Sequence, residues 1–481
     1  MTLSSKIAAN AFIQIVNKII STILSLITIA LVARHLGISG FGQYTTAITY
    51  ASFFAIVADL GLTLSASQLI SKPGVNENKI LSNLMLLRVV SAIGIISIAP
   101  LSALFVPYDE TIRTGILLSA LSLIFVAFNQ IFVAIFQKNL RTDKISLAET
   151  ISRIFMLGAT VWTIKAGFGL YGILAVNIFT GFFSFALHYF FSRDYAKVKL
   201  EYDRIYWLMI IKQTWPLALT IALNLIYLKA DTLLLSLIQR PSKIGIIEEV
   251  GIYGAAYKVI DVLATIPFML GGIILPIMTR LWHDNDKKGF AGILQKSFEI
   301  MMLFSIPIVF GTHFFSKEIM TLIAGPEFAD SGLILNYLVF ANLAIFFGNM
   351  FAHAIVAIEK QRETIIAYIL TALTALAGYI LLIPRFSYFG AAWTTIYSEA
   401  FIAFASLYII REHTGFFPDM RIILKSIAAS LVMTVEIILL QPFAHSIFIA
   451  IPAAMLTYTI AIYLFRGIKK EDLRNIFNQS N

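Results

Sequence analysis

Apolar stretches of helix length recur along the whole chain, and they constrain the fold more than any other feature. Hydropathy divides the 481 residues into fourteen candidate spans joined by short loops. Crossing the hydrocarbon core of a bilayer takes ~20 apolar residues in a helix, and each span approaches or exceeds that length. A mean hydropathy of +0.84 and a charged fraction of 13% agree. The sequence predicts an all-α integral membrane protein and excludes a soluble enzyme.

The predicted spans cover 10–32, 41–63, 80–105, 114–136, 146–164, 169–190, 209–236, 250–278, 293–313, 331–355, 364–383, 390–410, 422–440 and 447–465. The longest connection, around 191–208, has fewer than twenty residues, which leaves no room for a soluble domain. The N-terminus has no small-residue cleavage site after its apolar stretch, so we interpret it as a retained first span.

Two short echoes indicate an internal repeat. FGQYTTA (41–47) opens span 2 and VGIYGAA (250–256) opens span 8; GLYG (169–172) opens span 6 and SYFG (387–390) opens span 12. Both echoes are six spans apart, as duplicated six-helix bundles require. The alternative is that glycine–aromatic pairs simply recur at membrane interfaces. We expect two pseudo-symmetric lobes around a central cavity, 1–208 and 209–410, followed by a terminal hairpin and tail, 411–481.

Loop charges predict the topology. With the N-terminus inside, the cytoplasmic loops and tails carry 22 basic residues and the opposite side carries 7. Under the positive-inside rule both termini are cytoplasmic. The net charge of +9 therefore comes mostly from basic residues in the cytoplasmic loops and tails of a cytoplasmic-membrane protein, and we do not expect nucleic acid as a partner.

Several kinds of chemistry are excluded by residue type. The chain has no cysteine, and its seven histidines lie far apart with no pair at a metal-ligand spacing. It also has no Walker A sequence for hydrolysing a nucleotide. We expect no catalytic residue, metal or cofactor.

Fourteen charges lie inside predicted spans. Each costs at least ~2.5–3.5 kcal/mol near the bilayer centre, so they must pair, snorkel or face a wet cavity. The basic ones are Lys18, Arg88, Arg153, Lys212, Lys229, Lys258 and Lys296; the acidic ones are Asp59, Glu149, Asp231, Asp261, Glu299, Glu399 and Glu436.

Polar stripes single out four of the spans. Span 1 carries one at spacings of three and four, and spans 2, 7 and 8 carry shorter ones. These spans correspond to each other under the repeat, so we expect them to surround the cavity. The stripes are Asn10, Gln14, Asn17, Lys18, Ser21, Ser25 and Thr28; Thr45, Thr49, Ser52 and Asp59; Thr220, Asn224, Tyr227 and Asp231; and Gly254, Lys258, Asp261 and Thr265.

The charges divide by their expected roles. Glu149 and Arg153, four residues apart near a cytoplasmic end, are interpreted as a structural pair. The deep cations Lys18, Arg88 and Lys258 are expected to attract an anion into the cavity.

The deep aspartates Asp59, Asp231 and Asp261 are expected to couple transport to a proton or sodium gradient. Lys229 is two positions from Asp231 and would face the other side of a regular helix. Anion binding beside titratable aspartates predicts a secondary transporter and not an enzyme.

Six segments resemble a known family in order and spacing: LGISGFGQY (36–44), KADTLLLS (229–236), VGIYGAAYKVID (250–261), ILPIMTRLW (274–282), AIEKQRE (357–363) and LLIPRFSYFGAAW (381–393). They resemble the Wzx-like polysaccharide-export flippases of the multidrug/oligosaccharidyl-lipid/polysaccharide exporter superfamily. The resemblance implies translocation of an undecaprenyl-diphosphate-linked oligosaccharide by alternating access, driven by an ion gradient. By location, it implies that Lys18, Arg88, Lys229 and Lys258 contact the diphosphate or an acidic sugar.

Two other classes of protein are alternatives. A multidrug or cation antiporter of the same superfamily would need an acidic cavity, whereas the charges here are mixed. A membrane-embedded polysaccharide polymerase or ligase would carry a sizeable outward loop, and every outward loop here is short. If the protein is a flippase, a polysaccharide polymerase would instead be a partner that uses the translocated unit.

Overall fold

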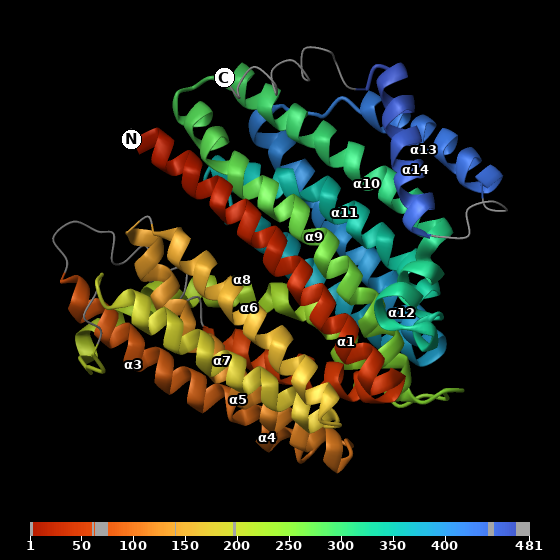
Figure 1. The fold of residues 1–481 in the computed structure, drawn as a ribbon. Coiled ribbons are helices and arrows are strands. Elements are labelled where there is room, and N and C mark those ends of the chain that lie inside the picture. Colours follow the sequence, from red (N-terminus) through yellow and green to blue (C-terminus); the bar gives the residue numbers. More distant parts are fainter. Residues whose placement is uncertain are drawn as a thin grey trace. The chain divides into compact units, whose positions relative to one another are not determined.

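The computed structural model describes residues 3–59, 62, 76–139, 141–195, 199–440 and 447–467 of the chain. Within these ranges, the side chains of 3–15, 77, 213, 215–228 and 440 are not described. The described residues are almost entirely helical and include no strand (Figure 1). This confirms the predicted all-α class.

Two of the helices are each built from two predicted spans. α1 (Leu3–Asp59) turns at Gly37, where φ is 66°, and α12 (Thr364–Thr414) turns at Ser387, where φ is 53° and ψ is −132°. Glycine reaches positive φ without a Cβ clash, whereas serine adopts it only where neighbouring groups hold it. The bends fall between spans 1 and 2 and between spans 11 and 12, where the sequence predicts loops.

The other predicted spans each correspond to a helix or a pair of short ones. They are α3 (Glu77–Ile96) with α4 (Ile98–Ala103), α5 (Glu110–Lys138), α6 (Thr142–Lys165), α7 (Leu170–Ser192), α8 (Arg204–Leu237), α9 (Ile246–His283), α10 (Lys287–Ala324), α11 (Ser331–Ala357), α13 (Arg421–Leu440) and α14 (Ile447–Leu464). A 3₁₀ turn, η1 (Pro326–Phe328), joins α10 to α11.

Ten helices are long and apolar enough to cross a membrane when only the described residues are considered. They include the double-span helices α1 and α12. α6 and α8 are not among the ten. α6 carries five charged residues along its length, and most side chains in the middle of α8 lie outside the described set. Residues 60–61 and 63, at the predicted end of span 2, also lie outside it.

The chain forms two compact units. The first comprises Met1–Gly254, Ile323–Gly325 and Leu376–Ala391, and the second comprises Ala255–Leu322, Pro326–Ala375 and Ala392–Asn481. Their boundaries do not coincide with those of the lobes expected at 1–208 and 209–410, which stay a prediction. In the first unit α8 packs against α1 and α3, so this helix shares the N-terminal bundle.

The first unit is held by apolar packing between its helices and by caps at helix starts. α5 packs against α1, α3 and α7 (Figure 1). Asp109 caps α5 through the amide of Ile112 at 2.8 Å, and Asp203 caps α8 through the amide of Ile205 at 3.0 Å. Such caps satisfy amides that a helix leaves unpaired at its first turn, and they lie where the sequence places loops.

The second unit has its main core between α9, α10, α11, α12 and α13, with Phe298, Phe346 and Phe351 fully buried. The α13–α14 hairpin packs on α10 through an apolar cluster and through hydroxyl contacts to backbone carbonyls of α10. The hydroxyls of Ser426 and Tyr458 lie 2.7 Å apart, and Tyr458 donates to the carbonyl of Leu303 at 2.9 Å. A hydrogen bond satisfied in this way fixes the hairpin without leaving a polar group in hydrocarbon.

Candidate substrate and ion sites

Buried Arg88 and half-buried Asp59 form an ion pair in the first unit. The guanidinium of Arg88, on α3, is 1% exposed, and its Nη1 lies 2.5 Å from Oδ1 of Asp59 at the end of α1. The same nitrogen lies 3.4 Å from the Asp59 carbonyl oxygen. One residue predicted to bind an anion therefore holds one predicted to bind a cation. Arg88 is enclosed by protein in this arrangement and does not face an open cavity.

Asp231, on α8, is a buried carboxylate with two hydrogen-bond donors. It is 1% exposed, its Oδ2 accepts a hydrogen bond from the hydroxyl of Tyr253 at 2.8 Å, and its Oδ1 accepts one from the amide of Thr232 at 2.5 Å. Tyr253, at the start of α9, is itself fully buried. Sequence reasoning selected Asp231 but missed Tyr253, whose hydroxyl is its partner. The predicted stripe members Asn10, Gln14, Thr220, Asn224 and Tyr227 lie outside the described side chains.

Lys229 precedes Asp231 on an uninterrupted helix and is half-buried. It interacts electrostatically with the Asp231 carboxylate.

Lys258 and Asp261 form a pair on α9 in the second unit. The Lys258 Nζ lies 3.3 Å from Oδ2 of Asp261, and the two side chains are 34% and 39% exposed. Their i,i+3 spacing places them on one helix face, as the sequence predicts. Unlike Arg88 and Asp231, both side chains are partly exposed.

Lys18 is exposed on α1, beside the contact between α1 and α6. The hydroxyl of Thr150 on α6 lies 3.4 Å from Oδ1 of Asn17 and 3.4 Å from the hydroxyl of Ser21. Further along the stripe, Thr28 donates to a carbonyl of its own helix at 2.8 Å. The polar stripe of span 1 thus serves two purposes: part of it packs on α6, and Lys18 stays accessible.

A second buried ion pair was missed by sequence reasoning, which counted Arg240 only as a loop charge. The guanidinium of Arg240 is 1% exposed and donates to Oε2 of Glu249, which is 7% exposed, at 3.0 Å from Nε and 2.5 Å from Nη2. Arg240 also donates to the carbonyls of Leu235 and Ile238 at 2.7 and 2.8 Å.

The hydroxyl of Ser387, at the bend of α12, donates to the Glu249 carboxylate. This bond anchors the Ser387 side chain at the bend, where the residue has a positive φ. A spacing of nine residues between Arg240 and Glu249 matches no helix or strand period, so no sequence pattern could have found the cluster.

Glycines bring α1 and α9 into close contact near these groups. A Cβ at Gly42 would lie 2.0 Å from the carbonyl oxygen of Ile247, and one at Gly251 would lie 2.3 Å from that of Ile38. Any larger residue would therefore force the backbones apart.

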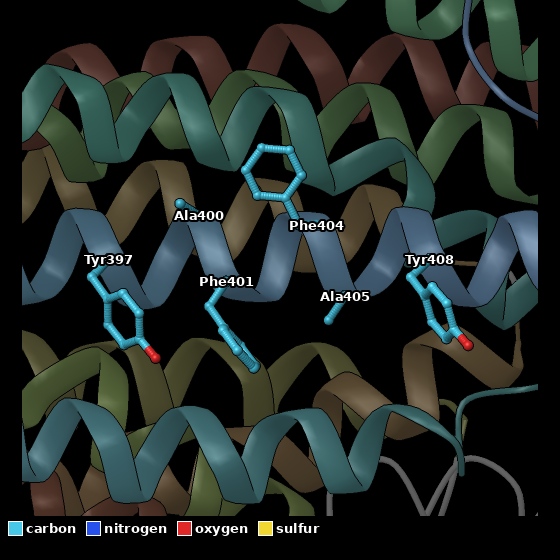
Figure 2. Close-up of a pocket in the computed structure, with 6 residues that line it drawn as sticks. All are labelled: Tyr397, Ala400, Phe401, Phe404, Ala405 and Tyr408. Atoms are coloured by element: carbon cyan, nitrogen blue, oxygen red, sulfur yellow. The ribbon is translucent and has the colours of Figure 1, made fainter.

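An apolar pocket lies on α12 in the second unit. Figure 2 shows Tyr397, Phe401 and Tyr408 projecting from the same side of the helix, and Ala400, Phe404 and Ala405 complete the lining. With no charged group in its wall, the pocket suits hydrocarbon and not a sugar or a phosphate. Across the described residues there is no group of three or more histidine, aspartate or glutamate side chains placed to hold a metal ion.

The chain is similar to known proteins over most of its length. The family described as "Polysaccharide biosynthesis protein" matches residues 7–282. A protein of Haloferax volcanii, described as probable low-salt glycan biosynthesis flippase Agl15, is 22% identical over 472 residues, covering 94% of this chain and 95% of the relative. A putative O-antigen transporter of Shigella flexneri is 24% identical over 399 residues, covering 78% of this chain and 90% of the relative.

Among solved structures, lipid II flippase MurJ in an inward closed conformation matches with a TM-score of 0.77. It is 19% identical, and the match covers 94% of this chain and 98% of that one. At this identity the likeness establishes the fold, which is that of a multi-pass membrane transporter.

Proposed function

The chain belongs to the polysaccharide biosynthesis protein family, and from this premise we propose that it is a flippase for a polyprenyl-diphosphate-linked oligosaccharide. The observation that carries the proposal is the similarity to a glycan flippase over 94% of this chain. The substrate has an anionic diphosphate, a polar glycan and a long hydrocarbon tail. We propose that the protein moves it across the cytoplasmic membrane, both termini lying in the cytoplasm, and makes or breaks no covalent bond.

The accessible cations support an anionic substrate. Lys18 is exposed in the first compact unit, and Lys258 in the second is partly exposed although it is paired with Asp261. Arg88 is already neutralised by Asp59, so we assign it a structural role. The apolar pocket on α12 is suited to the tail. A polysaccharide polymerase that uses the translocated unit is the partner we expect.

Contacts between helix ends support alternating access. The predicted topology places these ends on the side of the membrane opposite the cytoplasm. The glycine contacts between α1 and α9 and the Arg240–Glu249–Ser387 cluster join these ends within the first unit. We propose that they separate when the protein opens outward. In a resting state that is open to the cytoplasm, the outward side would then be closed by backbone contact and by buried hydrogen bonds.

Asp231 is our proposed ion-coupling residue. Its carboxylate is buried, it accepts a hydrogen bond from Tyr253, and Lys229 acts on it electrostatically. Gain or loss of a proton or a sodium ion there would change the balance of these three groups. Asp59 and Asp261 each already neutralise a basic partner and are the weaker candidates.

Liposome reconstitution tests the proposal. Fluorescent polyprenyl-diphosphate oligosaccharide is placed in both leaflets, and a membrane-impermeant quencher added outside reports how fast inner-leaflet lipid becomes accessible. We expect protein-dependent exchange that responds to an imposed pH or sodium gradient. In Asp231→Asn liposomes we expect exchange without that response. Protein-free liposomes are the control, and efflux of cationic dyes in place of lipid exchange would contradict the flippase.

A further inference from the structure

Arg153 is an exposed charge on α6, and it does not lie on the face of this helix that lipid would cover. It is the twelfth of the 24 residues of α6, which places it near the middle of the span. The exposed apolar residues of α6 are Leu147, Ile154, Phe155 and Trp162. At about 100° per residue they share an arc of roughly 100°, which is the face that lipid would cover.

The opposite face of α6 is packed against protein. Ser146, Ser152 and Thr160 are buried there, and Thr160 is 1% exposed. Arg153 lies at an angle of roughly 40° from Glu149 and falls between Ser146 and Thr160 on this buried face. Both Arg153 and Glu149 are nevertheless exposed. Protein packing against α6 is therefore incomplete around Arg153 and Glu149, on the side of the helix away from lipid.

The structure corrects the interpretation of Glu149 and Arg153 as a structural pair. Among the described residues, no ion pair joins them, and the one hydrogen bond of the Arg153 side chain is a weak contact of 3.8 Å to the sulfur of Met156. An arginine without a carboxylate partner cannot face hydrocarbon without a large cost, so its exposed side must meet water or an anion.

Polar groups from three helices surround this position. Tyr44 of α1 lies near Asn177 of α7 and interacts electrostatically with Arg153. One turn before Arg153, Thr150 contacts Asn17 of α1, and Lys18 follows Asn17 in the chain. All of these residues belong to the first compact unit.

We propose that Arg153 binds the diphosphate of the lipid-linked substrate, with Lys18 as the second cation; the inference rests on the proposed flippase function. A guanidinium offers paired N–H donors that fit two phosphate oxygens, which an ammonium cannot do. The lysines selected from the sequence supply charge without this geometry, and Arg88 is occupied by Asp59. Arg153 is thus the accessible arginine that gives the site its preference for a diphosphate. Glu149, one turn away on the same face, opposes the anion and limits its affinity.

Equilibrium binding in nanodiscs tests the assignment with three fluorescent lipids: polyprenyl diphosphate, polyprenyl monophosphate and neutral polyprenol. Arg153→Gln is expected to weaken diphosphate binding about 10- to 100-fold, as loss of charge-assisted hydrogen bonds does, and to leave polyprenol binding unchanged. Arg153→Lys is expected to retain part of the affinity but to discriminate less between diphosphate and monophosphate. Glu149→Gln is expected to bind the diphosphate more tightly.

Arg193→Gln is the matched control, because this exposed arginine lies after the end of α7, over the rings of Tyr189 and Phe190. It should bind all three lipids like the wild type. The assignment is overturned if Arg153→Gln binds the diphosphate with wild-type affinity, or if it loses polyprenol and diphosphate equally. Both outcomes are independent of the proposed function, which fails separately if the wild type translocates no lipid-linked oligosaccharide in liposomes.

Discussion

Removing one member of the buried Arg240–Glu249 pair should destabilise the protein far more than removing an exposed ion pair. In Glu249→Ala the guanidinium stays 1% exposed and loses its carboxylate. Breaking a buried pair from one side costs about 3–5 kcal/mol. Two backbone carbonyls still accept bonds from Arg240, so we expect a loss of about 3 kcal/mol in the free energy of unfolding.

The reverse change, Arg240→Met, leaves the Glu249 carboxylate buried without its guanidinium. The hydroxyls of Ser242 and Ser387 still donate to it, so we expect a loss of similar size, about 3 kcal/mol.

The assay is reversible unfolding by sodium dodecyl sulfate in mixed micelles, followed by tryptophan fluorescence. The double variant Arg240→Met/Glu249→Leu completes the cycle, and we expect it to be more stable than either single variant because no charge is left unpaired. The reasoning is refuted if all three variants unfold within about 0.5 kcal/mol of the wild type, as an exposed pair would allow.

Three further outcomes can be measured by unfolding or melting. Gly42→Ala should lose stability because its Cβ would meet a backbone carbonyl of α9 at 2.0 Å, whereas Gly158→Ala, with open space around it, should be neutral or gain about 0.5–1 kcal/mol. Both Ser387→Ala and Ser387→Gly lose the hydroxyl bond, but glycine accepts a φ of 53° and should be the more stable variant by about 1 kcal/mol. The hydrogen bond from His413 lowers the pKa of Glu363, so the advantage of the wild type over Glu363→Gln should be complete above about pH 4.3 and vanish as the pH falls through the lowered pKa; equal melting temperatures at pH 7 would contradict this.

The positions of the helices along the chain could be predicted from sequence, because each span must form its own backbone hydrogen bonds in hydrocarbon. The predicted span 331–355 became a helix at Ser331–Ala357, and 447–465 became one at Ile447–Leu464. The bends were harder. Hydropathy placed breaks near Gly37 and Ser387 but could not show that the helices continue through them, since the bend depends on contacts made elsewhere.

The candidate sites divide in the same way. Lys258 and Asp261 could be paired from their spacing because a single helix places both, and the structure confirms their contact. Arg88 with Asp59 and Asp231 with Tyr253 could not be paired, because 29 and 22 residues separate their members in the chain. Arg153 was misassigned for a related reason: helical spacing allows a bond to Glu149 but does not require one.

By itself, the sequence determined that this chain is a bundle of membrane-spanning helices with charges retained in its interior. That result depends only on local sequence, because each span must itself supply about 20 apolar residues to cross the bilayer. Only the tertiary structure decided which of those charges neutralise one another and which stay open. Asp59 closes off Arg88, whereas Arg153 remains exposed on a protein-packed face. The cost of an unpaired charge depends on what other helices bring to it, and no single span contains that information.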